Sequence, residues 1–371
     1  MKNRPSALLA LLAVTAFALL TTAAYGQKEE SKEDKKKKVE PFKVERLTQE
    51  MGLYSIGPVS PDRLSILLLA QRPEQAPNLY VMNLEDRSIR PPLSSFKWGV
   101  EDPKWSPDGL SVTFSGSSDT SSLPEVYTLE IKSGKVLRIT SNGFTDRHPV
   151  YTPDGKQLLF TSDASPLPDA AFGILHIAIA AAGGGKVEYF TEDEVSSIQP
   201  DISADKRAVL LIKVDEHSGR HSLWEYGLDG KQKRDLTKRK FARINGYKVA
   251  ATGDSIIIWG QEESEQQDTV YLLDLKSGSI RDLPDPDLPK RTPTVSADGR
   301  YIAFIGPSDT GTQLFVYDST TGLIEQLTIK PGNAFTPAFI SNTEIIFGSN
   351  RDRTNEIYYV NLASPRTEQK K

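Results

Sequence analysis

Five short segments that each run into a proline bring together acidic, basic, imidazole, amide and aromatic side chains. The candidate ligand contacts in and beside these segments are Trp98, Asp102, Arg147, His148, Gln199, Arg291 and Phe335. Charged groups interspersed with aromatic rings suit the recognition of a peptide or protein surface. The sequence therefore predicts a protein- or peptide-binding site, although each proline and the residue ahead of it also have a structural explanation as turn formers.

The sequence shows no catalytic constellation. It contains no GxSxG segment, and no cysteine is present to ligate a metal or form a disulfide. His217 and His221 flank a Ser-Gly turn, so they lack the helical spacing of a zinc motif. His176 is expected to pack inside a strand, which leaves His148 as the only histidine at the predicted site. We predict no catalytic residue, no metal and no cofactor, and hence a protein that is not an enzyme.

The candidate residues recur because the chain is built from repeats. A turn of the type Ser/Thr-Pro-Asp-Gly stands at 60–63, 106–109 and 152–155, with weaker copies at 203–206 and 296–299. Two decayed copies lie near 252–254 and 341–343, so neighbouring copies are about 44 to 51 residues apart. A period of this length with four short strands per repeat is typical of a propeller blade.

Each repeat predicts a defined series of strands. The second strands are expected at 65–70, 111–116, 157–162, 208–213, 255–260, 301–306 and 344–349. Each third strand carries a large apolar or aromatic residue at its second position: Tyr80, Tyr127, Leu175, Trp224, Tyr271, Phe315 and Tyr358. Such a layer suits packing between neighbouring blades. The fourth strands are shorter and more polar, and the first blade's version holds two prolines, which suits an outer edge.

The predicted fold is all-β: a seven-bladed β-propeller of four-stranded antiparallel blades spanning residues 42–362. The five segments that run into a proline are expected in loops just before the inner strands of the blades, so the predicted binding site lies at one mouth of the central channel. The last repeat stops after its third strand, and residues 44–48 match the fourth-strand pattern. We expect this N-terminal strand to pair with the last blade and close the ring, which removes exposed sheet edges. A six- or eight-bladed ring is the alternative.

The ends of the chain read as export and linker segments. Lys2 and Arg4 precede an apolar run at 7–20 and a group of small residues, which predicts a secretory signal peptide over residues 1–26. The alternative, a transmembrane anchor, is disfavoured because the run is short. Residues 27–41 are expected to be a charged linker and 363–371 a polar tail. We expect a periplasmic or extracellular protein.

The charge balance narrows the choice of partners. The net charge is −4, and it becomes −8 without Lys2, Arg4 and the net +2 of residues 28–38. An acidic ring is a poor polyanion binder, so nucleic acid is excluded as a partner. No apolar run after the signal is long enough to span a membrane. We expect a monomer.

The segment WSPDG with its alternating strand, and SNRDRTNEIYYVNL at 349–362, resemble the TolB-like family of periplasmic β-propellers with WD40-like repeats. The resemblance covers residues 42–362 and implies a non-enzymatic scaffold that binds envelope proteins. TolB itself has six blades and an N-terminal α/β domain, for which we expect no room here, so the resemblance is to the family and not to TolB itself.

The resemblance leaves other functions open. Similar repeats occur in Tricorn-like proteases and in the prolyl oligopeptidase family, whose helical α/β segment is not expected in this chain. One alternative is a carbohydrate-active or metal-dependent lyase or hydrolase, in which clustered histidines hold a metal in the channel. The other is an accessory propeller that serves a separate peptidase.

Overall fold

The computed structural model describes residues 41–71, 78–90, 99–117, 123–165, 173–238, 241–364 and 366. Every regular element among them is a β-strand, so the all-β prediction is confirmed for this part of the chain. The predicted signal peptide, Trp98, nearly all of the predicted linker and most of the polar tail lie outside the described residues.

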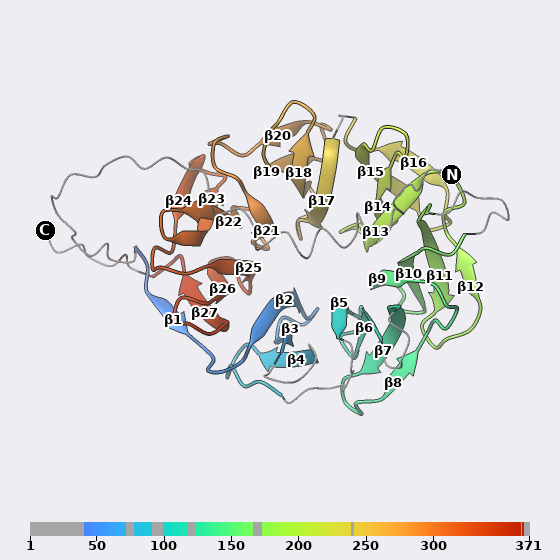
Figure 1. Cartoon of the computed structure of the whole chain (residues 1–371), viewed down its shortest axis with the longest axis horizontal. Coiled ribbons are helices and arrows are strands. Elements are labelled where there is room, and N and C mark those ends of the chain that lie inside the picture. The colour runs from blue at the N-terminus through green and yellow to red at the C-terminus, as the bar shows by residue number, and fades with distance from the viewer. Residues whose placement is uncertain are drawn as a thin grey trace, which may run out of the picture.

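Antiparallel sheets follow one another along the chain and surround a common centre (Figure 1). The first three contain β2 (Leu53–Val59), β3 (Ser65–Ala70) and β4 (Asn78–Asn83); β5 (Val100–Trp105), β6 (Ser111–Gly116), β7 (Glu125–Glu130) and β8 (Val136–Arg138); and β9 (Asp146–Tyr151), β10 (Gln157–Ser162), β11 (His176–Ala181) and β12 (Val187–Tyr189). Within each sheet, consecutive strands are hydrogen-bonded neighbours. The first strand of each lies nearest the centre (Figure 1).

The remaining sheets repeat this order. They contain β13 (Ser196–Ile202), β14 (Ala208–Val214), β15 (His221–Gly227) and β16 (Gln232–Asp235); β17 (Phe241–Val249), β18 (Ser255–Glu262), β19 (Thr269–Asp274) and β20 (Ile280–Asp282); β21 (Arg291–Val295), β22 (Tyr301–Ser308), β23 (Gly311–Asp318) and β24 (Leu323–Gln326); and β25 (Ala334–Phe339), β26 (Glu344–Ser349), β27 (Glu356–Asn361) and β1 (Val44–Arg46). One residue pair, His221 with Phe241, joins the first two of these. The N-terminal strand β1 pairs with β27.

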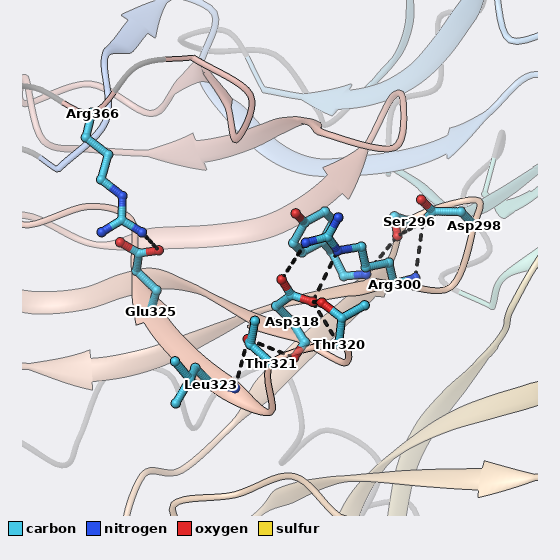
Figure 2. A network of polar contacts seen from close by, with 10 residues as sticks. Ser296, Asp298, Arg300, Asp318, Thr320, Thr321, Leu323, Glu325 and Arg366 are labelled. Carbon is cyan, nitrogen blue, oxygen red and sulfur yellow. Dashed lines mark hydrogen bonds and ion pairs between the residues drawn. The ribbon is translucent and has the colours of Figure 1, made fainter.

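The turn between the first two strands of a sheet is held by its own side chains. The Ser106 hydroxyl donates to Asp108 at 2.5 Å and accepts from the Ser111 N–H at 2.9 Å. Gly109 has a φ of +71°, which the left-handed position of the turn requires. Figure 2 shows the copy with Ser296, Asp298 and Arg300, in which the guanidinium of Arg300 also pairs with Asp318 at 2.8 Å.

The predicted second strands are confirmed, and four of them have the expected bounds. One third-strand prediction is wrong. The residue that lies opposite Phe160 is Ala178, whereas Leu175 precedes the strand. In the neighbouring sheet the equivalent position holds Tyr127, which stacks on Phe114 with ring centroids 5.6 Å apart. The continuous apolar run around Leu175 fits several registers, so the sequence pattern alone could not select the right one.

Fourth strands end early where a threonine hydroxyl replaces a backbone carbonyl as the acceptor of a hydrogen bond from the third strand. Thr140 follows β8, and its Oγ1 accepts the Val126 N–H at 3.0 Å and donates to Glu125 at 2.6 Å. Thr328 does the same for Leu314 and Gln313 in another sheet. In the first sheet the fourth strand is reduced to one bridge between Met82 and Ile89 within the described residues.

Candidate binding site at the bulged end of the inner strands

The residues ahead of the prolines lie inside the innermost strands. We expected them in loops before these strands, and that placement is wrong: Asp102 is in β5, His148 in β9 and Gln199 in β13. At each position the pairing with the second strand shifts register, which marks a β-bulge. We call the end of the ring at which these bulges lie the bulge end, and the opposite end, with the Pro-Asp turns, the turn end.

The bulge residues have a backbone conformation that side chains other than glycine rarely adopt. Their φ angles are +52° at Asp102, +54° at His148, +53° at Gln199, +46° at Thr292 and +38° at Thr336. Each precedes a proline, which disfavours the right-handed helical region for the residue before it. Such conformations cost roughly 1–3 kcal/mol and persist only where the surrounding structure enforces them. Recurrence in five sheets indicates a built feature of the fold.

One ion pair and one contact between an imidazole and a carboxylate connect the inner strands of adjacent sheets at the bulge end. Arg147 Nη1 lies 2.5 Å from Glu101 Oε2, and His148 Nε2 lies 3.7 Å from Asp102 Oδ2. All four side chains are about one third to one half exposed. Arg147, His148 and Asp102, predicted as ligand contacts from separate repeats, are thus brought together by the fold.

This pair of sheets also leaves polar atoms without partners. Arg147 Nε and His148 Nδ1 are shielded from solvent and have no hydrogen-bond acceptor or donor among the described residues. Buried polar atoms normally find a partner, and exceptions call for an explanation such as a ligand or an ordered water. The site is therefore polar and incompletely satisfied.

The other predicted contacts are placed differently. Gln199 is fixed by its backbone: its N–H donates to Thr161 Oγ1 at 3.0 Å and its carbonyl accepts from the Tyr247 hydroxyl at 2.8 Å. Arg291 begins β21 and is exposed. Phe335 instead lies over the backbone of Gly348, where an added Cβ would come within 2.1 Å of the ring, so Phe335 packs within its own sheet.

A second charged group lies two residues beyond the bulges, and the sequence analysis missed it. Lys104 Nζ in β5 lies 2.8 Å from Asp201 Oδ2 in β13, although a whole sheet separates these strands along the ring. Burial opposes the charge on both groups, but their mutual attraction prevails, so the pKa of Asp201 is lowered and that of Lys104 is raised. The spacing of both residues from the bulge could have revealed the pair.

Lys248 in β17 belongs to the same group. Burial lowers the pKa of Lys248 to about 8, and the charge of Lys104 adds to this effect while Asp201 opposes it. No hydrogen bond or ion pair connects the side chain of Lys248 to another described residue, whereas its backbone pairs with Ile257 in β18. Lys104 and Lys248 are thus both influenced by the one carboxylate of Asp201.

Asp146, which directly precedes Arg147 in β9, carries a buried carboxyl group. Its side chain is fully buried at the start of β9; one oxygen accepts from Asn142 at 3.0 Å and the other has no partner within the described chain. Burial raises the pKa of Asp146 to about 6, although the nearby hydroxyls of Ser162 and Thr140 and the amide of Asn142 act to lower it. Because the group is inaccessible to solvent, we assign it no contact with a ligand.

Neither a metal centre nor a membrane helix is found in the part of the chain that the structure describes. No group of three or more His, Asp or Glu side chains there is arranged to hold a metal ion. His176 is fully buried beside Tyr189, where burial lowers its pKa, as expected for a packed strand residue. None of these residues forms a helix long and apolar enough to cross a membrane.

The turn end has a different character. A cavity of about 320 Å³ lies there, and several of its lining residues are apolar. They include Val59, Val249, Val295 and Phe339 from four different sheets. The two ends of the ring therefore differ: charged groups from adjacent sheets meet at the bulge end, whereas the turn end holds a cavity lined by apolar residues together with Ser60, Arg63 and Ser341.

Antiparallel four-stranded sheets arranged around a common centre (Figure 1) define a β-propeller. The family model described as the TolB beta propeller domain matches residues 42–287, which is more than half of the chain. The chain therefore belongs to this family. The Tol-Pal system protein TolB of Francisella tularensis subsp. holarctica is 23% identical over 213 residues, which cover 57% of this chain and 46% of that protein. The chain thus spans about half the length of the curated relatives it matches.

Solved structures with similar folds include both enzymes and TolB. Oligogalacturonate lyase from Vibrio parahaemolyticus has a TM-score of 0.65 at 14% identity, covering 88% of this chain and 95% of that one. TolB from Acinetobacter baumannii has a TM-score of 0.53 at 18% identity, covering 79% and 68%. A puromycin-hydrolyzing peptidase from Mycobacterium tuberculosis has a TM-score of 0.64 at 14% identity, covering 86% and 53%. At these identities the likeness concerns the fold alone.

Proposed function

We propose that the chain is an exported, non-enzymatic propeller that binds a protein or peptide at its bulge end. The single observation that carries this proposal is the meeting of Glu101–Arg147 and Asp102–His148 between two inner strands, on bulges in a strained conformation. Backbone strain of this kind concentrates at functional sites. The family relationship to Tol-Pal system proteins supports a protein partner and export to the periplasm.

The proposal includes a ring of seven blades closed by β1. The contacts of β1 support it, because they reproduce those of β8 in an internal sheet. Arg46 Nε donates to the Thr48 carbonyl at 2.8 Å, as Arg138 does to that of Thr140. Thr48 Oγ1 donates to Glu356 at 2.6 Å, the same distance that separates Thr140 and Glu125. Because β1 makes the same contacts as an internal fourth strand, we assign it as the fourth strand of the last blade.

A co-purification experiment tests the binding proposal. The chain without residues 1–26 serves as bait for envelope extract, beside an Arg147→Ala/His148→Ala/Arg291→Ala variant. The control variant, Lys132→Ala/Lys156→Ala/Lys276→Ala, removes exposed cationic side chains away from the bulge end. We expect a partner that the wild type and the control retain and the bulge-end variant loses.

Two outcomes contradict the proposal. A partner retained equally by all three proteins places its binding surface elsewhere. If no protein is retained by any of them, the protein-scaffold function is overturned, and an oligosaccharide library with an assay for lyase or hydrolase turnover becomes the appropriate screen.

A further inference from the structure

Three charged side chains from separate sheets occupy one level of the ring. Lys104, Asp201 and Lys248 each pair with the third residue of the second strand of their sheet: Thr113, Leu210 and Ile257, respectively. The same register against the second strand gives the side chains the same direction, because alternate strand residues share a face. The contact between Lys104 and Asp201 shows that this direction brings side chains from non-adjacent sheets together.

The charges at this level do not balance. Of the equivalent residues in the other sheets, Val150, Thr294 and Ala338 are uncharged. Two lysines therefore share one carboxylate, and Asp201 is already committed to Lys104. Asp102 acts electrostatically on Lys104, whereas Lys104 and Asp201 are the charged groups that act on Lys248. The level carries an excess positive charge in a chain whose net charge is −4.

We propose that Lys248 binds a carboxylate that the protein or peptide partner inserts between the inner strands. This inference rests on the proposed function and specifies the chemistry that a partner bound at the bulge end meets further along the inner strands, in the direction of the turn end. Lys248 is exposed to water, so a partner can reach its side chain, and the protein mass around it is what disfavours its charge. A bound carboxylate supplies the counter-charge that Asp201 cannot, and an ammonium group attracts it as a compact point charge.

The pH dependence of binding follows from the groups that face Lys248. Asp201 has a lowered pKa and Lys104 a raised one, so both keep their charges around pH 8. The pKa of Lys248 is about 8 in the free protein, so Lys248 loses its proton over this range. Affinity for a carboxylate is therefore expected to fall as the pH rises through 8, and a bound carboxylate shifts the midpoint upward.

Isothermal titration with acetyl-Glu-Glu-Glu-amide tests the inference, with acetyl-Gln-Gln-Gln-amide as the uncharged probe. We expect the acidic peptide to bind more tightly than the neutral one, and Lys248→Met to weaken its binding by about 10- to 100-fold, as expected for a hydrogen bond to a charged group. Lys248→Arg should retain most of the affinity. Lys276→Met, which removes an exposed lysine from the outer turn of the same sheet, should leave it unchanged.

Equal binding of the two peptides, or equal affinity of wild type and Lys248→Met, overturns the inference, with thermal melting used to confirm that the variant is folded. The partner captured by co-purification separates this failure from failure of the proposed function. If wild type and Lys248→Met retain that partner equally, the bulge end still binds protein but Lys248 does not hold a carboxylate. If no partner is captured and the acidic peptide still binds through Lys248, the carboxylate site stands and the protein-scaffold function falls.

Discussion

At the bulge end, some of the residues that come together could be predicted from the sequence and others could not. Arg147, His148 and Asp102 were predicted from residue type and proximity to proline, and the fold brings them together. Phe335 has the same sequence context but packs on Gly348, because the direction of its side chain depends on a strand register that the sequence does not show. Lys104, Asp201 and Lys248 escaped notice for a related reason, since their meeting depends on the curvature of the whole ring.

Asp146 should make stability depend on pH. Its folded-state pKa of about 6 lies above the ordinary 3.8, so folding favours the protonated form and stability falls as the pH rises between these values. Asp146→Asn should therefore raise the free energy of unfolding by about 1–3 kcal/mol at pH 7.5 and lose most of that advantage at pH 4. Denaturant unfolding at both pH values measures this, and an equal effect at both would show that Asp146 is not buried as a neutral acid.

The left-handed bulge should reverse the usual order of strand propensities. Valine ordinarily stabilises a strand more than glycine, but a β-branched residue is strained at a φ of +53°. No side-chain hydrogen bond of Gln199 is found among the described residues, so substitution there reports mainly on the backbone. We expect Gln199→Gly to be more stable than Gln199→Val by at least about 1 kcal/mol in denaturant unfolding. The opposite order would exclude a left-handed conformation at this residue.

At the scale of elements, the sequence predicted most of what the structure shows. Every second strand begins at the expected residue because the turn ahead of it fixes where the strand starts, and four of these strands also end where expected. Third strands were less secure, and the Leu175 error arose where the apolar run is long and its turn signal weak. The role of the fourth-strand threonines was missed, because a residue type that recurs in the sequence does not show which hydrogen bonds its hydroxyl makes.

The β1 strand should contribute to stability as much as an internal fourth strand does. Thr48 and Thr140 each accept one backbone N–H and donate to one buried glutamate. Thr48→Ala and Thr140→Ala should therefore lower the free energy of unfolding by similar amounts, about 1–3 kcal/mol each. Thermal or denaturant unfolding of both variants provides the comparison, with Thr140→Ala as the matched control.

Removal of residues 42–48 gives a stronger version of the same test. It deletes β1 and the Phe42 side chain, which is 4% exposed and packs with Leu314 and Tyr358. We expect the melting temperature to fall by many degrees, since the outer edge of the last sheet is uncovered. Unchanged melting after this deletion, or a negligible effect of Thr48→Ala, would rule out closure by β1.

At the scale of the whole molecule, the ring gives its two ends different chemistry. The bulge end carries ion pairs between strands and polar atoms without partners, whereas the turn end surrounds a cavity with several apolar lining residues. Repeat spacing predicted the propeller architecture, because a blade cannot bury its faces without neighbours. The difference between the ends arises from residues that vary from blade to blade, and these define function within a common fold.

Site-directed photo-crosslinking tests the central claim, binding at the bulge end, most directly. A benzophenone amino acid is placed at Arg291 in β21, or at Ala297 just beyond the same strand, where it lines the turn-end cavity. After illumination in envelope extract, we expect the captured partner to form a covalent adduct from position 291 and none from position 297. An adduct from position 297 alone, or a partner that co-purifies without crosslinking from either position, would contradict binding at the bulge end.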